Sequence, residues 1–108
     1  MKIETNLIPE MTIEAFADQH GLTMQVTDRG ANYLKFCEEY GGESHRYLAN
    51  FKNCEVSDRG CLVSSYGNGH TAAEAISAYA KKISEQHLVF DAFTNNRQEF
   101  KAPRFVHD

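Results

Sequence analysis

The sequence predicts a single α+β domain spanning residues 1–108, with an antiparallel sheet of about four to six strands and two helices on one face. Its length of 108 residues is that of one ordinary domain. Hydrophobic residues make up 42% of the chain, which is enough for one modest core. Most apolar residues alternate with polar ones, as in half-buried strands, whereas two segments follow the helical period.

The first predicted helix covers residues 12–20. Ile13 and Phe16 recur at helical spacing, and Thr12 is a favourable N-cap residue. Gly21 is suited to the left-handed position that ends a helix. A short helix near the amino end is therefore expected.

The second predicted helix begins after Gly67-Asn68-Gly69, which we interpret as a β-to-α loop. Thr71 and Glu74 have the spacing of a capping box, in which each side chain accepts from the other residue's backbone N–H. An apolar stripe follows at helical spacing. Its residues are Ala72, Ala75, Ile76, Tyr79, Ala80 and Ile83.

The predicted strands fall before, between and after the two helices. They cover residues 22–26, 33–37, 45–56, 61–66, 88–93 and, as a final edge strand, 100–106. Residues 38–44, with Gly41-Gly42, are read as a loop. Pro103 has no backbone N–H, which favours an edge for the last strand. The expected order is α-β-β-β-β-α-β, with a further β at the end.

Two similar segments, Val26–Gly30 and Val56–Gly60, both contain Asp-Arg-Gly. Asp bonds to its own backbone two residues on, and Gly accepts positive φ, so both segments are expected to be hairpin turns with a bulge. Arg29 and Arg59 would then lie at exposed turn tips, and we take both as candidate interaction residues.

The cysteines argue for a reducing compartment. Cys37, Cys54 and Cys61 form an odd set without a CxxC pair, which fits neither a disulfide framework nor a zinc site. We expect three free thiols and a cytoplasmic protein. No apolar leader and no run of about 20 apolar residues is present, so no membrane association is expected.

The segment 67–74 is the part of the sequence where an anion-binding site is most plausible. A helix N-terminus favours anions, so this stretch is either a plain β-to-α turn or one that accepts an anion. Asn68 and His70 become candidate interaction residues there. No nucleotide-binding fingerprint is present, and His70 has no linked nucleophile, so we expect no cofactor, no metal and no enzyme. An enzyme built around His70 or a free cysteine is the remote alternative.

Charge argues against nucleic acid as a partner. The net charge is −4, and the 11 basic residues are scattered, whereas nucleic-acid binders carry a basic stripe.

From Tyr33 to Ile83, the order of elements resembles the double-stranded-RNA-binding domain, with residues 12–20 as its first helix. Gly41-Gly42 precedes His45, Phe51 and Val56 follow on a strand, and Gly67 and Gly69 lead into an Ala-rich helix. The family's lysines at the start of that helix are missing, since His70–Ala75 contains none. The resemblance implies the fold more than duplex-RNA binding.

In its size, acidity and mixed α/β pattern, the chain also resembles small accessory proteins of temperate phages, including inhibitors of bacterial defence systems. These features together predict a non-enzymatic protein-binding factor in the cytoplasm, the host cytoplasm if a phage encodes it. The alternative is a nucleic-acid-binding module of the double-stranded-RNA-binding type.

Overall fold

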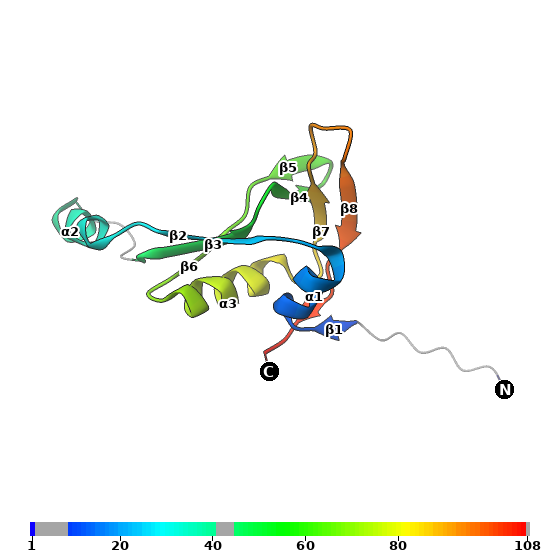
Figure 1. The fold of residues 1–108 in the computed structure, drawn as a ribbon, viewed down its shortest axis with the longest axis horizontal. Helices are drawn as coiled ribbons and strands as arrows, with labels where there is room; N and C mark the ends of the chain where they lie inside the picture. Colours follow the sequence, from blue (N-terminus) through cyan, green and yellow to red (C-terminus); the bar gives the residue numbers. More distant parts are fainter. Residues whose placement is uncertain (2–8, 41–44, 108) are drawn as a thin grey trace.

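The computed structural model describes residues 1, 9–40 and 45–107 (Figure 1). In this part of the chain, helices and mostly antiparallel strands alternate, which confirms the α+β class. The helices are α1 (Ile13–His20), α2 (Ala31–Tyr40) and α3 (Ala72–Ile83). The strands are β1 (Glu10–Met11), β2 (Met24–Asp28), β3 (Tyr47–Phe51), β4 (Cys54–Asp58), β5 (Cys61–Val63), β6 (Gly67–Gly69), β7 (His87–Phe90), β8 (Gln98–Lys101) and β9 (Arg104–Phe105).

The strands form three sheets. One is antiparallel with the order β2-β3-β6, a second is antiparallel with the order β5-β4-β7-β8, and β1 pairs in parallel with β9. The two larger sheets are joined because β3 runs almost directly into β4, while β5 and β6 return beside them. The predicted single strand over 45–56 is therefore two strands that belong to different sheets.

The break between β3 and β4 lies at Lys52 and Asn53. The Lys52 N–H donates to the Thr23 carbonyl on the β2 side at 2.9 Å, and the Asn53 carbonyl accepts from the Asp91 N–H on the β7 side at 3.0 Å. Asn53 has φ of 58°, a left-handed conformation that Asn tolerates better than most residues. Before the bend β3 pairs with β2, and after it β4 pairs with β7. The two strands therefore belong to different sheets.

Helix α2 replaces the strand predicted over 33–37, so that prediction is wrong. The predicted loop over 38–44 is also wrong at its start, because α2 extends to Tyr40, and residues 41–44 lie outside the described part. The closely spaced apolar residues of 33–37 fit a helical period as well as an alternating one, and short apolar runs do not separate the two. In the structure these residues belong to the helix that follows Gly30, and the ladder between β2 and β3 forms without them.

Helix α3 rests directly on the backbone of β6. A Cβ built on Gly69 would lie 2.5 Å from the Ala75 nitrogen, and one on Gly67 would lie 2.7 Å from the Tyr79 Cα. Both glycines are buried. The predicted loop at Gly67–Gly69 is therefore a strand, and its glycines serve the close approach of a helix.

The core is centred on Phe51 of β3. Its ring lies 6.2 Å from that of Phe16 on α1, 5.6 Å from that of Tyr79 on α3 and 6.0 Å from that of Phe90 on β7. Helices α1 and α3 thus meet the same side of the sheets, as the sequence predicted for its two helices. Of the predicted stripe of α3, Ala75, Tyr79, Ala80 and Ile83 are buried, and Ile76 is half-buried.

The predicted helix ends are confirmed. The Thr12 hydroxyl accepts from the Ala15 N–H at 3.1 Å, and Gly21 ends α1 with φ of 65°. The Thr71 hydroxyl accepts from the Glu74 N–H at 3.1 Å, but the Glu74 carboxylate accepts from the N–H of His70. The reciprocal bond is therefore made one residue before the predicted one.

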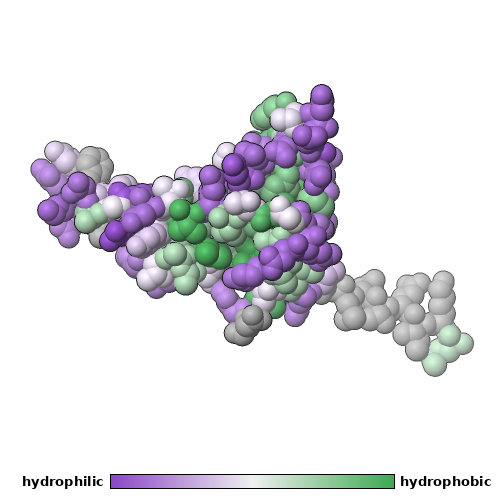
Figure 2. All heavy atoms as spheres, viewed as in Figure 1, coloured by the Kyte–Doolittle hydropathy of each residue, from purple (hydrophilic) through white to green (hydrophobic). Residues whose placement is uncertain are grey.

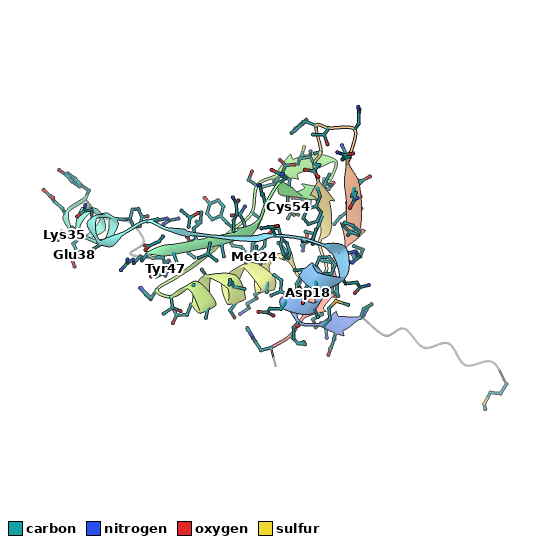
Figure 3. The ribbon with its side chains drawn as sticks, in the orientation of Figure 1. Asp18, Met24, Lys35, Glu38, Tyr47 and Cys54 are labelled. Atoms are coloured by element: carbon teal, nitrogen blue, oxygen red, sulfur yellow. The ribbon has the colours of Figure 1, made fainter. Side chains whose placement is uncertain are left out.

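Cys54, on β4 (Figure 3), is buried and Cys61 is exposed. Both are free thiols. The side chain of Cys37 lies outside the described part. Burial raises the pKa of the Cys54 thiol to about 11. None of the helices in the described ranges is long and apolar enough to cross a membrane.

We predict that Gly67→Ala lowers the free energy of unfolding by about 3 kcal/mol or more, because its methyl group overlaps the backbone of α3. Gly21→Ala is the matched control. Gly21 has positive φ but nothing within 4 Å of an added Cβ, so we expect a loss of only about 1–2 kcal/mol. Urea denaturation of both variants measures the difference. Equal losses would show that α3 does not depend on close contact with β6.

Candidate interaction site

Strands β2, β3 and β6 together with α2 form an arm that extends from the rest of the molecule (Figure 1). Helix α3 covers one side of its sheet, and α2 lies at its outer end, away from β7 and β8. Three of the four candidate residues predicted from the sequence, Arg29, Asn68 and His70, lie in this arm.

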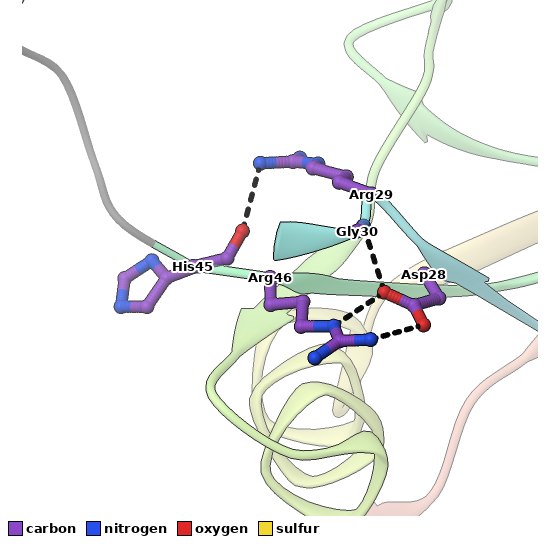
Figure 4. A network of polar contacts seen from close by, with 5 residues as sticks. All are labelled: Asp28, Arg29, Gly30, His45 and Arg46. Atoms are coloured by element: carbon purple, nitrogen blue, oxygen red, sulfur yellow. Dashed lines mark hydrogen bonds and ion pairs between the residues drawn. The ribbon is translucent and has the colours of Figure 1, made fainter. Parts of the chain in front are cut away.

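Arg29 ties together the strands at the outer end of the arm. Its guanidinium donates to the His45 carbonyl at 3.2 Å (Figure 4). The same guanidinium donates to the Asn68 Oδ1 at 3.0 Å. It also lies over the Tyr33 ring, 4.7 Å from its centre. One side chain therefore links the end of β2, the start of α2, the approach to β3 and the middle of β6.

Asp28 and Arg46 form a second link beside it. The Asp28 carboxylate accepts from Arg46 Nε at 2.6 Å and from Nη2 at 2.9 Å (Figure 4). The two side chains thus form a bidentate, charge-assisted pair. The same carboxylate accepts from the Gly30 N–H at 2.8 Å. The Arg46 hydrogen bond and then that of Gly30 lower the pKa of Asp28 to about 2.

These bonds also correct the prediction for the segment 26–30. It was expected to be a hairpin turn, but the Asp28 carboxylate holds Gly30 in a turn that leads into α2. Its counterpart at 56–60 is the predicted hairpin: Asp58 pairs with Cys61, and both Arg59 and Gly60 have positive φ, without a bulge in the ladder.

His45 and His70 bring two imidazoles together in the arm. Their ring centres are 5.0 Å apart with an interplanar angle of 62°. They are 25 positions apart in the chain, and the pairing of β3 with β6 brings them close. His70 precedes the N-cap of α3, as predicted.

The fourth candidate, Arg59, lies apart from the arm, at the tip of the β4–β5 hairpin in the other sheet. Arg29, in contrast, is not at an exposed turn tip, because its guanidinium bonds to His45 and Asn68. Asn68 holds Arg29, and its neighbours Gly67 and Gly69 are buried under α3. Residues 67–69 therefore form a strand where the sequence predicted a loop.

The outer edge of β2 is the feature of the arm that sequence reasoning missed. Strand β2 ends its sheet, and Gln25–Asp28 are exposed. Arg29 N–H donates to Arg46 O, and Lys52 N–H to Thr23 O, each at 2.9 Å. Because bonded pairs alternate along an antiparallel ladder, the backbone groups of Met24, Val26 and Asp28 point away from β3.

A serine and a histidine also meet outside the arm. Ser77 Oγ lies 2.6 Å from His107 Nε2, thirty positions along the chain. Ser77 is in the middle of α3, where backbone N–H groups bond within the helix and are not available to stabilise an oxyanion. The pair fastens the carboxyl-terminal segment to α3.

Among the described residues, no group of three or more His, Cys, Asp or Glu side chains is arranged to hold a metal ion. Comparison with protein-family models, curated proteins and solved structures gave no match to this chain.

We predict that Arg46→Met raises the pKa of Asp28 from about 2 towards its ordinary value of 3.8, because the guanidinium is the main cause of the shift. The pair stabilises the arm at pH values above 3.8, and this contribution is lost as the pH falls through about 2. Carbon-detected NMR titration of the Asp28 carboxyl measures the change. Arg59→Met, in the other sheet, is the control and should leave the Asp28 titration unchanged.

Proposed function

We propose that this chain is a non-catalytic binding protein that joins a protein partner through the outer edge of β2. The observation that carries the proposal is an exposed edge strand whose outward N–H and C=O groups lie on an arm held in place by side-chain contacts. Adding a strand to such an edge is a common mode of protein recognition, in which main-chain hydrogen bonds supply the affinity.

Composition distinguishes the β2 edge from the other exposed edges. Natural sheets protect their edges with charged side chains, proline or very short strands. Strand β8 carries Glu99 and Lys101, and β5 and β6 have only three residues each. Strand β2 presents Gln25, Val26 and Thr27 before its first charge, and Val26 is 40% exposed. These features favour β2 as the edge kept available for pairing.

The contacts of Arg29 and Asp28 support the same role. They fix β2 to β3 and β6 before any partner arrives, so little ordering free energy is needed on binding. The small acidic chain also resembles phage accessory proteins, which makes a host defence protein the first partner to examine. We extend the proposal to inhibition of such a system.

We predict that Val26→Pro abolishes partner binding while the fold is kept. Proline removes an outward N–H and leaves the ladder to β3 intact, which edge strands tolerate. Lys101→Pro is the matched control, since Ala102 N–H bonds to Gln86 O and the backbone of Lys101 therefore points outward from β8. Quantitative affinity purification from the native host should recover partners with wild type and Lys101→Pro but not with Val26→Pro. Recovery of the same partners with all three would refute the proposal.

We also predict no useful binding of duplex RNA at physiological salt. Such binding needs several simultaneous cation–phosphate contacts. Here Arg46 is paired with Asp28, Lys82 donates to the Tyr66 carbonyl, and the Glu74 carboxylate lies at the start of α3. Fluorescence anisotropy with a duplex of about two helical turns tests this. Sub-micromolar binding with a steep salt dependence would favour the RNA-binding alternative instead.

A further inference from the structure

A small groove runs beside β2 on the side of the sheet that the helices cover. It has a volume of about 200 Å³ and lies between α1, the start of β2 and α3. Its apolar lining includes Ile13, Ala17, Leu22, Met24 and Ile76. Figure 2, in the same view as Figure 1, shows apolar surface where β2 and α3 lie next to each other.

The groove is continuous with the free edge of β2. Residues directly opposite one another in a sheet share a face, and Met24 and Val26 lie opposite Phe51 and Ala49, both fully buried beneath the helices. Met24 and Val26 therefore face the helices, and Met24 itself lines the groove. A strand added beside β2 would direct every second side chain to this same face.

Two carboxylates border the apolar lining. Glu14 and Asp18 are one helical turn apart on α1, both are exposed, and both line the groove. Figure 3 shows Asp18 on α1 close to Met24 on β2. A side chain that enters from an added strand would therefore meet apolar surface first and then two negative charges.

We propose that the partner contributes an extended segment that adds to β2 as a further strand and carries, on one face, an apolar residue with a basic residue two positions away. An apolar side chain fills the groove against Met24 and Ile76. A Lys or Arg two positions away, on the same face, reaches Glu14 and Asp18. This inference rests on the proposed function and specifies the chemistry of its partner.

The arrangement explains why both parts of the contact are needed. Main-chain hydrogen bonds to Met24, Val26 and Asp28 are independent of sequence, so the edge alone would accept any extended chain. The groove selects one apolar side chain, and the acidic border rejects acidic segments by like-charge repulsion. Specificity thus comes from the helical side and affinity from the edge.

The test uses two synthetic peptides of about nine residues, since strands in proteins are of this size or shorter. Both carry valines on one face; one has lysines and the other glutamates at the flanking positions of that face. Fluorescence anisotropy with the full chain should show the lysine peptide binding at least about tenfold more tightly. In the variant with Glu14→Gln and Asp18→Asn, this preference should disappear.

Protection of the Val26 amide from hydrogen exchange on peptide binding, and loss of binding in Val26→Pro, locate the peptide on the edge. Equal affinity for the two peptides, or a preference retained in the Glu14→Gln, Asp18→Asn variant, would overturn the proposed chemistry. Failure of both peptides to bind while Val26→Pro still loses its cellular partners would overturn it too, but would leave the proposed function intact. Sedimentation showing a dimer that Val26→Pro dissociates would replace the peptide by a second copy of the chain.

Discussion

The contact between α3 and β6 is the constraint on which the rest of the structure depends. Gly67 and Gly69 have no side chains, so the backbone of α3 lies against the backbone of β6 at the level of Ala75 and Tyr79. This close approach places Tyr79 next to Phe51, which α1 and β7 also contact through Phe16 and Phe90. Had either glycine been larger, α3 would stand off from the sheet and these aromatic contacts would be lost.

The same contact determines what the arm can present. Helix α3 packs on one side of the β2-β3-β6 sheet, and within the described residues β2 has a neighbouring strand on one edge only. The sheet is too small to be stable alone, since three strands need a packed face. The contacts of Arg29 and the pair between Asp28 and Arg46 extend this support to the outer end, which is beyond α3. An exposed edge and an ordered backbone are thereby combined.

Two polar side chains of the arm that the sequence suggested for partner binding instead stabilise the fold. Arg29 and Asn68, two residues that the sequence suggested for contact with a partner, bind each other. The partner surface that we propose is instead the backbone of β2, with the apolar groove and the carboxylates of Glu14 and Asp18 beside it. Recognition would therefore rest on main-chain hydrogen bonds and shape, with charge acting as a filter.

The α+β class, the two capped helices α1 and α3 and the hairpin at Arg59-Gly60 were all predictable from the sequence. Each of these depends on residues close together in the chain: an N-cap hydroxyl, a helical apolar stripe, or a pair of residues that accept positive φ. Such features can be predicted from a sequence because the residues that form them lie within a few positions of one another.

The remaining features depend on contacts between residues that lie far apart in the sequence. Residues 33–37 carry apolar residues that suit either period, and the structure places them in the helix Ala31–Tyr40. Asp28 and Asp58 lie in similar segments, but they end differently. Asp28 bonds to Arg46, 18 positions further along the chain, and its segment leads into α2, whereas the segment of Asp58 forms a hairpin. The edge of β2, its groove and the roles of Gly67 and Gly69 depend on which distant segments come together, and a single sequence does not encode that locally.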